Sequence, residues 1–234
     1  MSNAKFDGYA AQYDSWFINN ENVFLSELKL LKSALDLTDG GRMLSIGCGS
    51  GLFEEQLRTQ YGINVTDGVE PSEDMATIAK CRGMSVQIAT AETAQLEENS
   101  YDVIYFNGSS SYIADLKLAY GNVLTALKPG GSLILLDVPK ESAYGLLYLL
   151  AAARGSYDGL EDVAPADSYP IELARSAYWH TTPEKSAVLT DELGLHDLQY
   201  RQTLSTAPIY SNDFVEEPRE GFDRGGYVAI IARR

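Results

Sequence analysis

Short apolar runs alternate with segments of helical periodicity over most of this chain. The clearest helix has apolar residues at helical spacing, namely Phe24, Leu28, Leu31 and Leu35. Five apolar runs indicate strands, at residues 43–46, 63–69, 85–89, 101–106 and 132–138. Strands that alternate with helices in this way predict an α/β fold with a doubly wound, mostly parallel sheet and right-handed crossovers.

Two more strands are predicted near the C-terminus, at residues 198–204 and 227–232. The long acidic loop between them, residues 212–226, carries no helical signal. Parallel neighbours need a crossover connection, which is usually a helix. We therefore expect these two strands to pair antiparallel.

We expect residues 1–234 to form a single domain, because the chain length is ordinary for one domain. Residues 1–40 contain an aromatic stripe that includes Tyr13, and they predict an N-terminal helical cap. Residues 139–180 break the alternation after the fifth strand with an apolar helix and a looser acidic stretch. We interpret this segment as an insertion or lid.

Charge and composition exclude several classes of protein. The formal net charge of −15 would repel a phosphate backbone, so we expect no nucleic-acid partner. No apolar run approaches the roughly 20 residues of a membrane span, and the N-terminus has no signal pattern, so we expect a cytoplasmic protein without a membrane partner. Cys48 and Cys81 are too few for a disulfide framework. Asp137 ends the fifth strand without clustered His, Asp or Cys partners, so no metal site is predicted.

A glycine loop is the most informative stretch of the sequence. Gly47, Gly49 and Gly51 follow the first strand directly, and a helix begins at Leu52. Glycine accepts positive φ and lacks a Cβ, so the backbone can approach a ligand closely. The free N–H groups of the helix N-terminus favour an anion. The loop therefore predicts a site for a carboxylate or a phosphate, with Cys48 as a small packing residue.

A dinucleotide such as NAD(P) is one of two cofactors that could bind at this loop. A dinucleotide fingerprint needs a small residue in its third place, where helix and strand pack closely. Counting from Gly47, Gly49 takes the second place but Leu52 takes the third. NAD(P) therefore fits less well, and an NAD(P)-dependent oxidoreductase stays open as an alternative.

The ordered motifs of this chain resemble the class I S-adenosylmethionine-dependent methyltransferases, in particular the small-molecule branch that includes ubiquinone and biotin biosynthetic enzymes. The resemblance covers most of the chain, at residues 6–14, 44–51, 68–72 with Met75, 91–92, 101–104 and 127–131. It implies a seven-stranded sheet whose last strand is antiparallel. It also implies S-adenosylmethionine as cofactor and S-adenosylhomocysteine as product.

The resemblance assigns roles at matching positions. The glycine loop would hold the methionine portion, and Glu70 would accept hydrogen bonds from both ribose hydroxyls, as two carboxylate oxygens can. Pro71 and Met75 would pack against adenine. The full set of expected cofactor-binding residues is Tyr13, Gly47, Cys48, Gly49, Gly51, Glu70, Pro71, Met75, Ala91, Glu92 and Asn107. Ser45 and Thr90 stand where the family usually or often has an acid, which puts two cofactor contacts in question.

Catalysis would need little from the protein, because the sulfonium is already an activated methyl donor. The expected reaction is direct in-line displacement onto a small organic acceptor, with the protein holding the acceptor and excluding water. His180 and Tyr112 are the candidate catalytic residues. The aromatic and slightly acidic 139–180 segment suits a neutral or cationic acceptor, although core packing or a homodimer contact would explain its aromatic residues equally well. A cofactor-binding protein without transferase activity is the second alternative.

Overall fold

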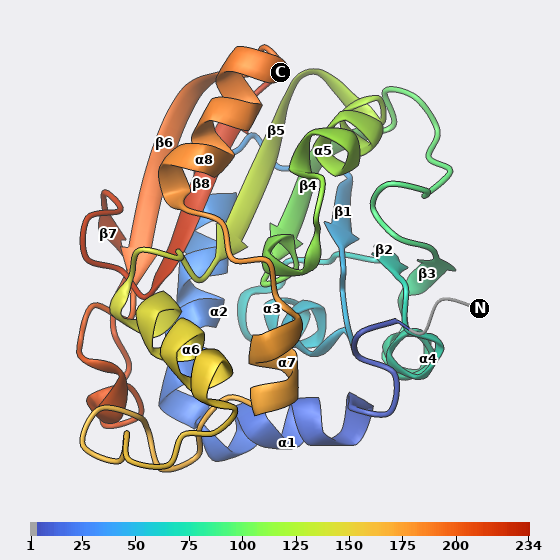
Figure 1. Cartoon of the computed structure of the whole chain (residues 1–234). Coiled ribbons are helices and arrows are strands. Elements are labelled where there is room, and N and C mark those ends of the chain that lie inside the picture. Colours follow the sequence, from blue (N-terminus) through green and yellow to red (C-terminus); the bar gives the residue numbers. More distant parts are fainter. Residues whose placement is uncertain (1–3) are drawn as a thin grey trace.

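The computed structural model describes residues 4–234. Its strands are β1 Met43–Ile46, β2 Asp67–Glu70, β3 Ser85–Ile88, β4 Tyr101–Asn107, β5 Leu127–Asp137, β6 His196–Thr203, β7 Arg219–Glu220 and β8 Tyr227–Arg233. They form one sheet in the order β3-β2-β1-β4-β5-β8-β6-β7 (Figure 1). Strands β1 to β5 are parallel, and β8 pairs antiparallel with both β5 and β6. The prediction of a mostly parallel sheet with an antiparallel last strand is confirmed.

Helices cover both faces of the sheet. The α-helices are α1 Ala10–Asn19, α2 Glu21–Leu35, α3 Leu52–Tyr61, α4 Glu73–Cys81, α5 Leu116–Leu124, α6 Ala143–Arg154, α7 Ile171–Ser176 and α8 Thr182–Ala187. Helices α2 and α3 lie behind the sheet in Figure 1, and α5 and α8 lie in front of it. Short helical turns at Ser110–Tyr112, Val188–Glu192 and Pro208–Tyr210 complete the set.

The core follows from the alternation of side chains along the buried strands. In β4, Val103 and Tyr105 pack with the α2 and α3 side of the core. Ile104 and Phe106 of the same strand pack with the α5 side. Successive strand residues point to opposite faces, so a sheet covered on both sides needs a continuous apolar run. The run at 101–106 meets that requirement.

Several element boundaries differ from the sequence prediction. The sheet has eight strands, because the two-residue β7 adds to the edge at β6. Strand β2 begins at Asp67, later than the predicted residue 63. Strand β5 begins at Leu127, earlier than the predicted residue 132, and it includes Gly130 at φ +77°. The short helix α7 inside the 139–180 segment was not predicted.

The carboxyl ends of the parallel strands point toward a layer formed by α1, α6 and α7 (Figure 1). These three helices come from the predicted N-terminal cap and from the 139–180 segment. In open α/β sheets, ligands bind outside the carboxyl ends of the strands, near the change in strand order. That change lies between β1 and β4. Across residues 4–234, every helix is too short or too polar to cross a lipid bilayer.

Candidate active site

A cavity of about 640 Å³ opens at the carboxyl ends of the strands. Its lining comes from the ends of β1, β2, β4 and β5, from the start of β8, and from the helical layer opposite them. The cavity brings together ten of the residues predicted from the sequence: Tyr13, Gly47, Gly49, Glu70, Pro71, Met75, Ala91, Glu92, Asn107 and Tyr112.

Three predicted residues lie outside the lining. The Cys48 side chain packs toward Gly68 and Met84, and burial raises the pKa of its thiol well above the usual value. Gly51 caps α3 at φ +73°, where a Cβ would meet Met84. The Nε2 atom of His180 lies 2.9 Å from the carbonyl oxygen of Ile113. That contact joins the 139–180 segment to Ile113, which lines the cavity, whereas His180 itself does not.

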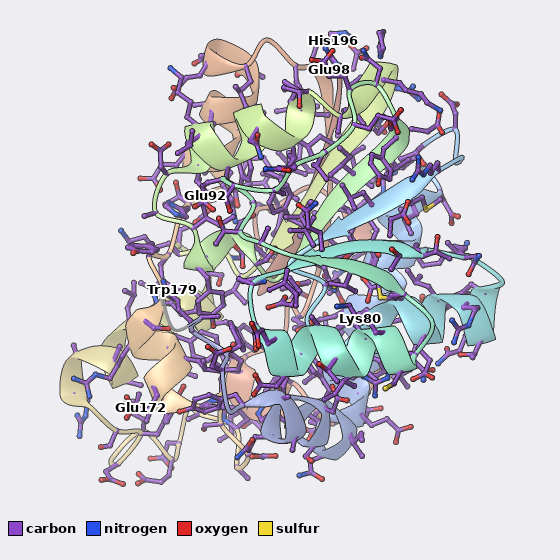
Figure 2. All side chains as sticks on the ribbon, turned by 90° about the vertical axis from the view of Figure 1, so that its right-hand side faces the viewer. Lys80, Glu92, Glu98, Glu172, Trp179 and His196 are labelled. Carbon is purple, nitrogen blue, oxygen red and sulfur yellow. The ribbon has the colours of Figure 1, made fainter. Side chains whose placement is uncertain are left out.

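The other histidine, His196, is remote from this cavity. Figure 2 shows His196 at the top of the molecule, well above Trp179, which lines the cavity. His196 is exposed, at the amino end of β6, and its Nδ1 atom contacts Asp197. Neither histidine of the chain therefore lines the cavity.

The glycine loop needs its glycines for steric reasons. Gly47 has φ +67°, and a Cβ on it would lie 2.5 Å from the Cβ of Ser109. Its backbone N–H donates to the carbonyl oxygen of Val69 at 2.7 Å, which fixes the loop against β2. Gly49 has φ +55°, and a Cβ on it would lie 3.8 Å from the ring of Tyr13. The loop thus exposes bare backbone to the cavity.

Glu70 ties this loop to the end of β2. Its Oε2 atom accepts from the N–H of Gly49 and its Oε1 atom from the N–H of Ser72, both at 2.9 Å. Each oxygen keeps a further acceptor site toward the cavity. The side chain is buried, and this burial raises the pKa of Glu70 to about 7, against the lowering effect of the two hydrogen bonds.

The two positions that depart from the family pattern have different surroundings. Ser45 is buried and donates from Oγ to Oε1 of Glu54 at 2.7 Å, and Tyr105 donates to the same oxygen at 2.8 Å. Ser45 thus hydrogen-bonds to an acid of α3, but neither Ser45 nor Glu54 lines the cavity. Thr90 does line it, with its hydroxyl 3.0 Å from that of Thr93.

Helix α1 is fastened over this half of the cavity by one carboxylate. Asp14 accepts from the Ser50 hydroxyl at 2.5 Å and from Nη2 of Arg82 at 2.7 Å. Ser50 belongs to the glycine loop, and Arg82 follows α4. The N-terminal helix is thereby joined both to the glycine loop and to the chain just after α4.

Comparisons with known proteins agree on one family. Residues 44–135 match the methyltransferase domain family. A S-adenosylmethionine-dependent methyltransferase from Thermotoga maritima, described as a "possible histamine N-methyltransferase", is 28% identical, with 98% of each chain covered and a TM-score of 0.82. This chain belongs to the class I S-adenosylmethionine-dependent methyltransferases.

Other relatives of this methyltransferase extend the comparison. An uncharacterized protein of Methanocaldococcus jannaschii is 29% identical over 229 residues, which cover 98% of both chains. Phosphoethanolamine N-methyltransferase 2 of Caenorhabditis elegans is 28% identical over 92% of this chain, which spans 45% of that longer protein. The prediction of a methyltransferase is confirmed, and these comparisons do not favour the oxidoreductase alternative.

The other half of the methyltransferase cavity lies beneath the 139–180 segment. Tyr148, Tyr169 and Trp179 of this segment line the cavity, whereas Tyr144, Tyr157 and Tyr178 do not. The hydroxyls of Tyr169 and Tyr112 lie 2.6 Å apart, and burial raises the pKa of both phenols. This pair links the segment to the chain after β4.

Two buried acids of the methyltransferase line this second half, and sequence reasoning did not assign either one to the site. Glu27 lies on α2, and Asp137 ends β5. A signal for Glu27 was present: it lies three residues after Phe24 and four before Leu31, so it falls within the apolar stripe of its helix. An acid on a core-facing helix position indicates a buried carboxylate with a specific role.

The two acids differ in their partners. Asp137 accepts from the Ser111 hydroxyl at 2.8 Å, and the ammonium of Lys185 lies 3.4 Å from the same oxygen, with both charged side chains almost fully buried. Glu27 has no hydrogen-bond or ion-pair partner among residues 4–234, although it is only 8% exposed. Burial, followed by the charge of Asp137, raises the pKa of Glu27 to about 8.

Proposed function

We propose that this chain binds S-adenosylmethionine in the cavity and transfers its methyl group to a small organic acceptor. The observation that carries this proposal is the buried carboxylate of Glu70, which is held by the N–H of Gly49 and still faces the cavity. A carboxylate fixed in this way accepts hydrogen bonds from two neighbouring hydroxyls, such as those of a ribose.

The residues present suit the nucleoside and amino-acid portions of this cofactor. Gly47 and Gly49 would admit the methionine portion against bare backbone, where the start of α3 favours its carboxylate. Pro71, Met75 and Ala91 would border the adenine, and Glu92 would meet its polar edge. Asn107, whose Oδ1 atom accepts from the hydroxyl of Tyr227 at 2.9 Å, would border the methionine end.

The bound cofactor supplies a methyl group on a sulfonium, so an acceptor lone pair takes the methyl in one in-line displacement while the electrons of the broken carbon–sulfur bond stay on sulfur. The protein's part is to orient the acceptor and to exclude water. The 139–180 segment would act as a lid, with Tyr148, Tyr169 and Trp179 covering the acceptor. Tyr112 would position the acceptor from the chain after β4.

The two halves of the cavity would then hold the two reactants. Glu70 ends β2 and Asp137 ends β5, three strand positions apart in the sheet. At about 4.8 Å per strand this separates the two strand ends by about 14 Å. The ribose would lie at the β2 side and the acceptor at the β5 and β8 side. Two relatives are named for methyl transfer to nitrogen, a possible histamine N-methyltransferase and a phosphoethanolamine N-methyltransferase, which supports a small nitrogen-containing acceptor.

Thermal unfolding with S-adenosylhomocysteine tests the proposed cofactor site. A ligand that binds only the folded state must raise the melting temperature, and 100 times its Kd adds about 2.7 kcal/mol. We expect this shift for the unchanged protein and its loss in Glu70→Ala. Asp67→Asn is the matched control, because Asp67 lies on the same strand but pairs with the half-exposed Arg42. An undiminished shift in Glu70→Ala, or a shift with NADP and none with S-adenosylhomocysteine, would overturn the proposal.

A further inference from the structure

Glu27 is an ionisable group for which the cofactor site has no use. Its side chain is 8% exposed, it lines the cavity, and within residues 4–234 nothing hydrogen-bonds to it. A buried charge without a partner costs several kcal/mol, so proteins pair such groups or use them. The missing partner is therefore expected to come from a ligand.

The other charged groups of the lining leave Glu27 unneutralised. Asp137 already has Lys185, at 3.4 Å. Lys5 also lines the cavity, but its ammonium donates to the carbonyl oxygens of Ser176 at 2.6 Å and Tyr112 at 3.3 Å. Within residues 4–234, therefore, no cation pairs with the Glu27 carboxyl, which is mostly protonated at pH 7 until a cationic ligand binds.

Aromatic rings surround the same end of the cavity. Tyr227 and Glu27 both line the cavity, and burial followed by the Glu27 carboxylate raises the pKa of the Tyr227 phenol. Tyr148 stacks at a tilt on Trp179, with ring centroids 5.4 Å apart, and on Tyr169, at 5.5 Å. The faces of tyrosine and tryptophan rings attract cations, most strongly where water is excluded.

We propose that the acceptor is a small amine carried on an aromatic or apolar group, and that it enters as an ammonium ion whose charge is paired with Glu27. This inference rests on the proposed function, since it names the acceptor of the same cavity. The observation behind it is a buried, partnerless carboxylate at the aromatic end of a cavity whose opposite end carries the glycine loop and Glu70.

Glu27 would also receive a proton. An ammonium has no lone pair, so it must lose one proton before its nitrogen can accept a methyl group. The Glu27 carboxylate takes that proton from the nitrogen, becomes neutral, and later returns the proton to solvent. The neutral amine keeps its electron pair for the new carbon–nitrogen bond.

Calorimetry on the complex with S-adenosylhomocysteine tests the inference, with 2-phenylethylamine as probe and 2-phenylethanol as its neutral isostere. We expect the amine to bind at pH 8.5 and the alcohol to bind at least about 30-fold more weakly, as for loss of one member of a buried charge pair. The Glu27→Gln variant should bind the amine at least about 30-fold more weakly than the unchanged protein does. Glu21→Gln, an exposed acid on the same helix, is the matched control.

A second readout needs no variant. At pH 7 a carboxyl with a pKa of about 8 is mostly protonated, so binding of the ammonium should release about 0.9 proton, seen as a dependence of the binding heat on the ionisation enthalpy of the buffer. The other ionisable groups that face Glu27 are Asp137, which is paired with Lys185, and phenols with raised pKa values, namely Tyr13, Tyr144, Tyr148, Tyr169 and Tyr227.

The outcomes separate this inference from the proposed function. Failure of the unchanged protein to bind S-adenosylhomocysteine would overturn the proposed function itself. Equal binding of amine and alcohol, or no proton release, would overturn the amine acceptor while leaving the cofactor site intact. A tenfold weaker S-adenosylhomocysteine affinity in Glu27→Gln would assign Glu27 to the cofactor's own ammonium and would also overturn the inference.

Discussion

The two halves of the cavity are built in opposite ways. The half at β1 and β2 uses backbone: bare glycines, helix N–H groups and one acid, Glu70, that is hydrogen-bonded on both oxygens. The half beneath the 139–180 segment uses side chains: stacked aromatic rings and two buried acids, of which only Asp137 has a cation. A backbone site suits a cofactor that stays the same, whereas the side chains of the other half would set the choice of acceptor in the proposed reaction.

Removal of Lys185, the buried cation that pairs with Asp137, should have the largest effect. Lys185→Met leaves Asp137 buried without its counter-ion, and breaking such a pair costs about 3–5 kcal/mol. We expect the free energy of unfolding in urea to fall by that amount. Lys117→Met removes an exposed pair with Glu192 and should cost less than about 1 kcal/mol. Equal costs would contradict the view that the second half depends on a balanced charge.

Glu27→Gln should act in the opposite direction, because Glu27 has no partner to lose. Its pKa is about 8 in the folded protein against 4.5 for the unperturbed group, so the folded state holds the proton more tightly. The contribution of protonated Glu27 to the free energy of unfolding is therefore complete below pH 4.5 and is lost as the pH rises toward 8. We expect Glu27→Gln to be more stable than the unchanged protein by about 2–4 kcal/mol at pH 8.5 and nearly equal to it at pH 4.5, in urea denaturation.

Gly47→Ala tests the backbone half. The residue has φ +67°, and a Cβ would lie 2.5 Å from Ser109, so strain and overlap together should cost about 2–3 kcal/mol of unfolding free energy. Affinity for S-adenosylhomocysteine should fall at least about tenfold. Gly62→Ala is the control: it has φ +68° but nothing within 4 Å of the new Cβ. It should show only the backbone strain, about 1 kcal/mol, and unchanged affinity.

The pH dependence of cofactor binding should show the smallest effect. Ribose hydroxyls donate to an ionised carboxylate, and burial raises the pKa of Glu70 to about 7. Protonation therefore competes with the ligand as pH falls. S-adenosylhomocysteine affinity measured by calorimetry should drop about tenfold between pH 8 and pH 6. A flat profile would show that the Glu70 carboxylate does not hold the ribose.

The backbone half could be predicted from sequence because its parts are local. The strand, the glycine loop, the helix and the following acid occupy residues 43–70, and each has a distinct residue pattern. The structure brings Gly47, Gly49 and Glu70 together in the cavity as expected. Their roles toward the cofactor remain predictions that the experiments above address.

The side-chain half could not be predicted in this way, because its parts are distant in sequence. Glu27, Asp137 and Lys185 come from three elements, and only the folded sheet brings them together. The place of His180 at the end of the 139–180 segment makes it a candidate for the rim of the pocket, but its imidazole contacts the carbonyl of Ile113. Strand β7 could not be predicted, because Arg219–Glu220 has only two residues and no apolar pattern.

The Asp14 carboxylate has a consequence for turnover. It holds helix α1 to Ser50 and Arg82 at once, so the helix cannot swing away from the glycine loop without breaking both contacts. If α1 must move for the product to leave, product release would require breakage of the Arg82–Asp14 ion pair. Salt screens a largely buried pair only weakly, so added salt should change the rate of product release little. Breakage of the Asp14 contacts, and not methyl transfer, would then limit the rate of turnover.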